Sequence, residues 1–200
     1  MDSLLPSLLP LALFAFVSSV TPGPNNIMLT SSGIRFGFVR TMPHIFGICF
    51  GFAVLTAICA AGIGSLIIAL PAMHVVLQIL GSGYLVYLAW QMRSMAFSRD
   101  VESNVRPMSF LGAALFQFAN PKAWVMGITG ASAFLPPVQP VALAILLFCL
   151  VFSLINLPCL SLWAGTGAVL RRYLTQRKWQ LLFCGVMIVL TLYSALAIWL

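Results

Sequence analysis

Lys122 is a cationic side chain near the middle of a long apolar stretch, within the sequence FANPKAW. An ammonium group near the centre of a bilayer costs roughly 2.5 to 3.5 kcal/mol on insertion scales, so it normally faces a polar cavity or partner. Asn120 and Pro121, directly before it, interrupt the apolar run. Lys122 could therefore hold the carboxylate of a small solute. The alternatives are a lysine that snorkels to the interface and one that makes a purely structural pairing.

A second group of helix-breaking residues, TPGPNN, occupies residues 21–26. Pro22 and Pro24 lack backbone donors and their rings clash with the preceding turn, so a helix must break or kink near Gly23. Unpaired backbone groups cannot face lipid, so such a break is tolerated only inside protein or beside a wet cavity. Asn25 and Asn26 would supply polar side chains to that cavity.

The composition indicates a membrane protein. Hydrophobic residues make up 62% of the 200 residues and charged residues 6%, and the mean hydropathy is +1.07. Because this small number of polar groups cannot cover the surface of a water-soluble globule, we expect the chain to lie in a lipid bilayer. The ten Lys and Arg residues exceed the three acids, but they gather on no amphipathic or aromatic-interleaved face. No nucleic-acid partner is therefore expected.

Six apolar stretches are each long enough to cross a hydrocarbon layer of about 30 Å. Their continuous hydrophobicity favours helices over the alternating strands of a barrel. The predicted fold class is an all-α membrane protein with six transmembrane helices, of which helices 1 and 4 are broken. The predicted spans are residues 4–30, 44–70, 73–92, 109–134, 141–168 and 181–200.

Basic residues predict the orientation of these spans. Nine of the ten fall in alternate connections, after spans one, three and five: Arg35, Arg40, Arg93, Arg99, Arg106, Arg171, Arg172, Arg177 and Lys178. The positive-inside rule makes these connections cytoplasmic and both termini external. The N-terminus has only Asp2 before the apolar run, so we expect no cleaved signal peptide and a retained first span.

The two predicted breaks lie in corresponding halves of one transmembrane domain, residues 1–200. Residues 1–97 and 98–200 each hold three spans, and an odd number makes the second half enter the membrane from the opposite side. Paired broken helices in inverted repeats are typical of transporters with a substrate site near the midplane. The alternative is that the prolines only kink two helices for packing.

Several segments resemble the LysE/RhtB family of amino-acid exporters. They are TPGPNNIMLTSSGIRFGFVRTMPHIFGICFGF, GSGYLVYLAWQM, FQFANPKAW and SLWAGTGAVLRRYL, in order along nearly the whole chain. The resemblance implies a bacterial inner-membrane protein of about six helices that expels amino acids or related metabolites. It is closest to the branch for neutral compounds such as homoserine, threonine, cysteine and O-acetylserine. The motif residues it implicates are Thr21, Pro22, Gly23, Pro24, Asn25, Asn120, Pro121 and Lys122.

The distribution of acids favours a neutral substrate. Asp2, Asp100 and Glu102 all lie outside the predicted spans, whereas a dibasic amino acid would need a buried anion. The carboxylate of a neutral amino acid could instead meet Lys122 and a half-helix N-terminus near Asn25. Its ammonium could meet unwound carbonyls and asparagine amide oxygens, which adds Asn26 to the predicted binding residues.

The lack of an intramembrane acid leaves two coupling mechanisms open. Either Lys122 exchanges a proton in step with substrate binding, as proton antiport requires, or the substrate gradient alone drives transport. The family resemblance favours the antiport.

His44 lies beside Pro43 at a predicted span end. We expect it to be an interface histidine whose ring nitrogens are satisfied by hydrogen bonds, with a proton relay as the alternative.

Three further features suggest packing. The cysteines lack metal or disulfide spacing and are expected to act as small hydrophobic residues. Asn156 and Pro158 predict a third interruption, in span five, where Asn156 either joins the transport pathway or only packs. Pairs of small residues should let helices approach closely, with gating flexibility as the alternative; these pairs are Gly47 and Gly51, Gly81 and Gly83, and Gly165 and Gly167.

An enzyme, a channel and an accessory subunit are the rival classes. The spans contain no nucleophile with a base, paired carboxylates or metal cluster, so we expect no catalytic residue, metal or cofactor. A passive channel, an accessory subunit, and an exporter of basic amino acids or other metabolites remain alternatives to a neutral amino-acid exporter. The sequence leaves open whether the working unit is a monomer or a homodimer.

Overall fold

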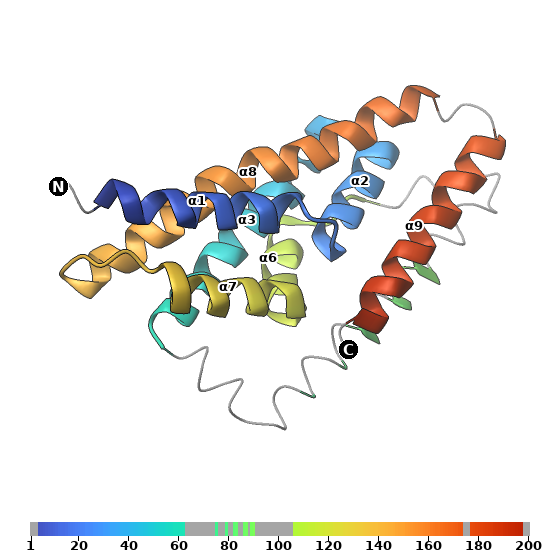
Figure 1. Cartoon of the computed structure of the whole chain (residues 1–200). Helices are drawn as coiled ribbons and strands as arrows, with labels where there is room; N and C mark the ends of the chain where they lie inside the picture. The colour runs from blue at the N-terminus through green and yellow to red at the C-terminus, as the bar shows by residue number, and fades with distance from the viewer. Residues whose placement is uncertain are drawn as a thin grey trace.

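The computed structural model describes residues 4–62, 106–173 and 177–197, and eight separate positions between 75 and 90 (Figure 1). Every regular element in this part of the chain is a helix. The third predicted span, the last third of the second, and the basic residues Arg93 and Arg99 lie largely or wholly outside the described residues. The helices are α1 (Leu4–Val20), α2 (Pro24–Phe36), α3 (Phe38–Ala60), α6 (Phe110–Ala119), α7 (Pro121–Phe134), α8 (Val141–Tyr173) and α9 (Arg177–Ala197).

The long helix α8 is the element on which the others are arranged. Helices α1, α2 and α3 pack against it, and α3 also packs against α6 and α7. In the view of Figure 1, α8 runs diagonally and crosses α1, and α7 lies below α1. Helix α1, from the first half of the sequence, therefore packs against α7 and α8, which both come from the second half.

Both predicted helix breaks are confirmed. Helix α1 ends at Val20 and α2 begins at Pro24, with an angle of 55° between them. Helix α6 ends at Ala119 and α7 begins at Pro121, with the extended residue Asn120 between them. Each second helix starts with a proline because the first helical position needs no backbone donor.

The join between α2 and α3 corrects the predicted boundary of the second span. We expected a connection over 31–43, but α2 continues to Phe36 and α3 begins at Phe38. Gly37 alone makes this turn, with φ of 80°, a conformation that glycine adopts without steric cost. Arg35 and Arg40 consequently lie in the terminal turns of the two helices, and Pro43 lies inside α3.

Helix α8 corrects the predicted third interruption. It runs without a break through Pro158. One internal proline removes a single hydrogen bond, whereas each confirmed break combines proline with glycine or asparagine.

Two helical segments are long and apolar enough to cross a membrane, Phe38–Ala60 and Val141–Leu170. The bent pair Ser7–Val20 and Pro24–Phe36 makes a third if it counts as one span. The described part of the chain thus gives an all-helical protein with two or three candidate membrane spans. The arrangement of six spans in two inverted repeats stays a prediction.

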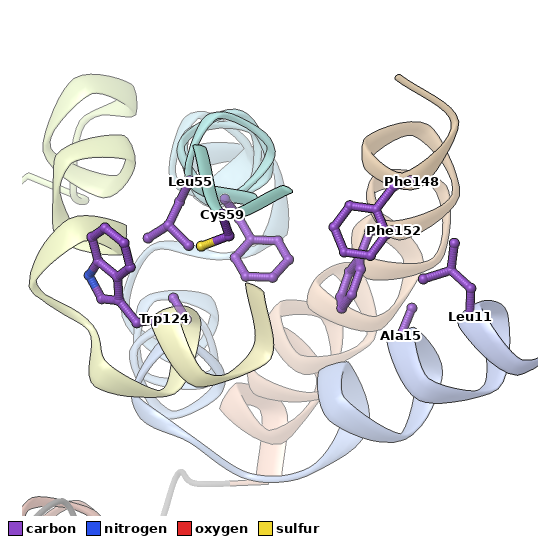
Figure 2. Close-up of a cluster of buried hydrophobic side chains, with 9 residues drawn as sticks. Leu11, Ala15, Leu55, Cys59, Trp124, Phe148 and Phe152 are labelled. Atoms are coloured by element: carbon purple, nitrogen blue, oxygen red, sulfur yellow. The ribbon is translucent and has the colours of Figure 1, made fainter. Parts of the chain in front are cut away.

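Within the described residues, the largest buried cluster joins α1, α3, α7 and α8 (Figure 2). Phe152 is its centre: its ring lies 5.0 Å from that of Phe52, 5.8 Å from that of Phe148 and 6.0 Å from that of Phe14. Edge-to-face pairs at these separations are favourable packing geometries. This cluster fixes the four helices that surround the join between α1 and α2.

Glycines allow the close helix contacts that the sequence predicted. A β-carbon at Gly47 would overlap the carbonyl of Phe110, and one at Gly51 would overlap that of Ala114. Gly167 lies equally close to the backbone of Thr30. No described residue would lie within 4 Å of a β-carbon at Gly83, so a close contact there stays a prediction, and Gly81 lies outside the described residues.

Candidate functional site

The ammonium group of Lys122 bridges the two helix breaks. Its Nζ atom donates to the carbonyl oxygen of Thr21 at 2.7 Å and lies 3.4 Å from that of Pro22. A β-carbon added to Gly23 would lie 2.8 Å from Lys122 Cδ. The lysine side chain therefore lies directly against the first break, although about 100 residues separate the two in the sequence.

Asn26 closes the first break from the α2 side. Its Nδ2 atom donates to the carbonyl oxygens of Ser19, at 3.0 Å, and Thr21, at 2.9 Å. These carbonyls are at the C-terminal end of α1, where helical partners run out. Asn26 and Lys122 thus share the Thr21 carbonyl, and together they compensate for the donors that Pro22 and Pro24 lack.

Asn25 joins the two breaks through a residue that the sequence analysis missed. Its Nδ2 atom donates to Gln117 Oε1 at 2.8 Å, and Gln117 Nε2 donates back to Asn25 Oδ1 at 3.3 Å. Gln117 also donates to the carbonyl of Ala113 at 2.9 Å and is completely buried. A glutamine inside the apolar run before Asn120 was the signal that could have identified it.

The helix N-termini at the breaks differ in their capping. The Asn120 side chain accepts from the Lys122 backbone amide at 3.2 Å and so caps α7. The N-cap of α2 is Gly23, which offers no side chain. No described side chain therefore caps the first backbone amides of α2, and an uncapped helix N-terminus favours an anionic ligand.

A cavity lies where the breaks meet. The empty space between the lining residues is about 350 Å³, a figure that includes space open to solvent. Lys122 is the only charged group among the described residues that line it. The lining residues are Ser18, Ser19, Gly23, Pro24, Asn25, Asn26, Phe52, Asn120, Lys122, Ala123, Met126, Asn156 and Leu160.

Seven of the ten predicted site residues line this cavity: Gly23, Pro24, Asn25, Asn26, Asn120, Lys122 and Asn156. The other three have different positions. Thr21 and Pro22 present their carbonyl oxygens to Lys122, and Pro121 begins α7. Ser18 and Ser19 also line the cavity and were not predicted, although the signal for them is two adjacent serines in an apolar run. The sequence analysis also missed the apolar lining residues, which look like any other span residues.

His44 does not have the predicted environment. It is 2% exposed, and neither ring nitrogen has a hydrogen-bond partner in the described part of the chain. The expected satisfied interface histidine is therefore wrong. The physical reason is that α3 begins at Phe38, so residue 44 lies in its second turn and not at a span end.

The fold and the cavity define a class of protein. Broken apolar helices that enclose a polar cavity are the construction by which membrane transporters hold a solute. Within the residues that the structure describes, no group of His, Cys, Asp or Glu could hold a metal ion.

The comparison with known proteins identifies the family. Residues 16–195 match the family described as LysE type translocator, and the chain belongs to this family. It is accordingly an efflux transporter with helical membrane spans, and not an enzyme.

Curated relatives cover most of the chain. A cysteine/O-acetylserine efflux protein of Klebsiella pneumoniae subsp. pneumoniae is 34% identical over 188 residues, covering 88% of this chain and 93% of the relative. Proteins of the same name from Escherichia coli O157:H7 and Shigella flexneri serotype 5b are each 29% identical over 185 residues, covering 92% of this chain and 93% of each relative. No solved structure matches the chain.

Proposed function

We propose that this protein exports small neutral amino acids or close derivatives from the cytoplasm across the bacterial inner membrane. The proposed substrates belong to the class of cysteine, O-acetylserine, homoserine and threonine. The observation that carries the proposal is the Lys122 ammonium in the cavity, held by hydrogen bonds across both helix breaks. The names of the relatives support this substrate class.

In the proposed binding mode, the substrate carboxylate meets the Lys122 ammonium and the uncapped N-terminus of α2. A charge-assisted hydrogen bond and a helix N-terminus both favour an anion there. The substrate ammonium meets carbonyl oxygens at the first break and asparagine amide oxygens. The described lining of the cavity contains no carboxylate, which argues against basic amino acids as substrates.

Transport would proceed by alternating access between two inverted three-helix repeats, residues 1–97 and 98–200, with both termini external. The bond between Lys122 and the Thr21 carbonyl is one that a substrate carboxylate would replace. That exchange would loosen the contact between the two breaks when substrate binds. Proton antiport is the proposed coupling, with Lys122 as the group that gives up and regains the proton.

The test is counterflow in proteoliposomes that contain the purified full-length protein. Vesicles loaded with unlabelled cysteine should accumulate labelled cysteine with saturation, and unlabelled lysine inside should not drive the exchange. Lys122→Met should reduce exchange at least roughly ten-fold, the equivalent of one charged hydrogen bond. Lys178→Met, an exposed lysine outside the cavity, is the matched control. Normal exchange by Lys122→Met, or flux without saturation, contradicts the proposal.

A further inference from the structure

The hydroxyl group of Ser19 is a buried polar group without a partner at the cavity wall. Ser19 lies in the last turn of α1 and is 4% exposed. Its Oγ atom has no hydrogen-bond partner in the described part of the chain, although the Ser19 carbonyl is bonded by Asn26. Buried polar groups are normally paired, so an unpaired one that lines a cavity indicates a missing partner.

Asn156 presents a second polar group to the cavity, from another helix. It is 5% exposed and lines the same cavity from α8. No hydrogen bond to its side-chain amide is found among the described residues. By contrast, the amides of Asn25, Asn26 and Asn120 are all engaged at the breaks. Asn156 and Ser19 are therefore available to a ligand.

Apolar residues flank these two groups. Leu160 follows Asn156 by one helical turn on the same face of α8, and Phe52 contributes from α3; both line the cavity. A neutral hydroxyl and a neutral amide between apolar walls suit an uncharged polar group of small size. They offer both donors and acceptors, so a hydroxyl, a thiol or an ester carbonyl would satisfy them.

We infer that Ser19 and Asn156 form a side-chain subsite that selects amino acids with a short, uncharged, hydrogen-bonding side chain. This inference rests on the proposed function and assigns residues to its substrate specificity. An aliphatic side chain of the same size displaces water from the subsite and leaves both groups unpaired. A site built to hydrogen-bond a substrate rejects the analogue that lacks the polar group far more strongly than an apolar pocket rejects a change of one methylene.

The test compares serine with 2-aminobutyrate, which replaces the hydroxyl by a methyl group. In counterflow, the unmodified protein should prefer serine by at least roughly ten-fold in rate at low concentration. Ser19→Ala and Asn156→Leu should each lower serine exchange and leave 2-aminobutyrate exchange unchanged or faster, which removes the preference.

Ser31→Ala is the matched control. Ser31 Oγ is also buried and unpaired in the described part of the chain, but Ser31 does not line the cavity. This variant should keep the preference for serine. Equal rates for the two substrates in the unmodified protein overturn the inference. An equal loss of both substrates in Ser19→Ala also overturns it, because the hydroxyl would then bind a group common to all amino acids.

A binding measurement separates this inference from the proposed function. The thermal stability of the purified protein is measured with added serine and with added 2-aminobutyrate. If serine stabilises the protein and 2-aminobutyrate does not, and no counterflow is seen, the result contradicts the proposed export function and supports the proposed subsite. Counterflow without a preference contradicts only the subsite. Neither stabilisation nor counterflow by either compound contradicts both.

Discussion

The side-chain amides of Asn25 and Gln117 hydrogen-bond to each other in both directions across 92 residues of sequence. This pair joins the start of α2, after the first break, to the end of α6, before the second. Together with the Lys122 contact to Thr21, it makes the two breaks one structural unit. A change at either break should therefore affect the other.

The amide pair predicts energetic coupling between Asn25 and Gln117. Gln117→Ala removes both hydrogen bonds that the Asn25 side-chain amide makes with Gln117 and should destabilise the protein by about 1 to 3 kcal/mol. In a double-mutant cycle with Asn25→Ala, the coupling free energy should be about 0.5 to 3 kcal/mol, because the two side chains share both hydrogen bonds. Chemical unfolding of the purified protein in detergent measures each free energy. Strictly additive effects of the two substitutions would contradict the pairing.

The cap at Asn120 predicts a graded effect of substitution. Asn120→Ala removes the acceptor of the Lys122 backbone amide and should cost about 1 kcal/mol. Asn120→Ser keeps an oxygen acceptor at the N-cap and should cost less. Thermal unfolding of both variants checks the order. Equal loss in the two variants would show that packing of the buried asparagine, and not its cap, matters.

The sequence predicted the two breaks well because their causes are local. Proline next to glycine or asparagine removes donors and favours extended backbone, whatever the surroundings. The turn at Gly37 escaped prediction because the sequence analysis took Pro43 as the start of a helix, whereas a helix can contain an internal proline. The position of a break is thus easier to predict than the end of a span.

The contacts of the site were only partly predictable. Lys122 in an apolar run requires a partner, but only the fold places the Thr21 carbonyl beside it. The pairing of Asn25 with Gln117 depends on how α2 and α6 meet, which no local pattern encodes. The side chains of Ser19 and Asn156 share a cavity because α1 packs along α8.

The contact between α3 and α6 predicts intolerance of a methyl group at Gly51. A β-carbon there overlaps the backbone carbonyl of Ala114, so the helices would have to separate. We expect Gly51→Ala to destabilise the protein by about 1 to 3 kcal/mol, the usual cost of overpacking. Gly185→Ala is the control, because a β-carbon at Gly185 in α9 meets none of the described atoms within 4 Å. A similar melting temperature for both variants would contradict the close approach.

The contact between Gly23 and Lys122 predicts a loss of transport without a loss of folding. The backbone of Gly23 is extended, with φ of −168°, so alanine fits there without strain. The added β-carbon would lie 2.8 Å from Lys122 Cδ and 3.0 Å from Nζ, so the lysine side chain must shift from its position at the first break. If Lys122 binds the substrate carboxylate from that position, Gly23→Ala should reduce exchange roughly ten-fold, as losing one charged hydrogen bond would. Gly165→Ala, whose β-carbon would come no nearer than 4.0 Å to Phe38, should exchange normally. Normal exchange by Gly23→Ala in a well-folded protein would mean that the position of Lys122 at the break is not needed for transport.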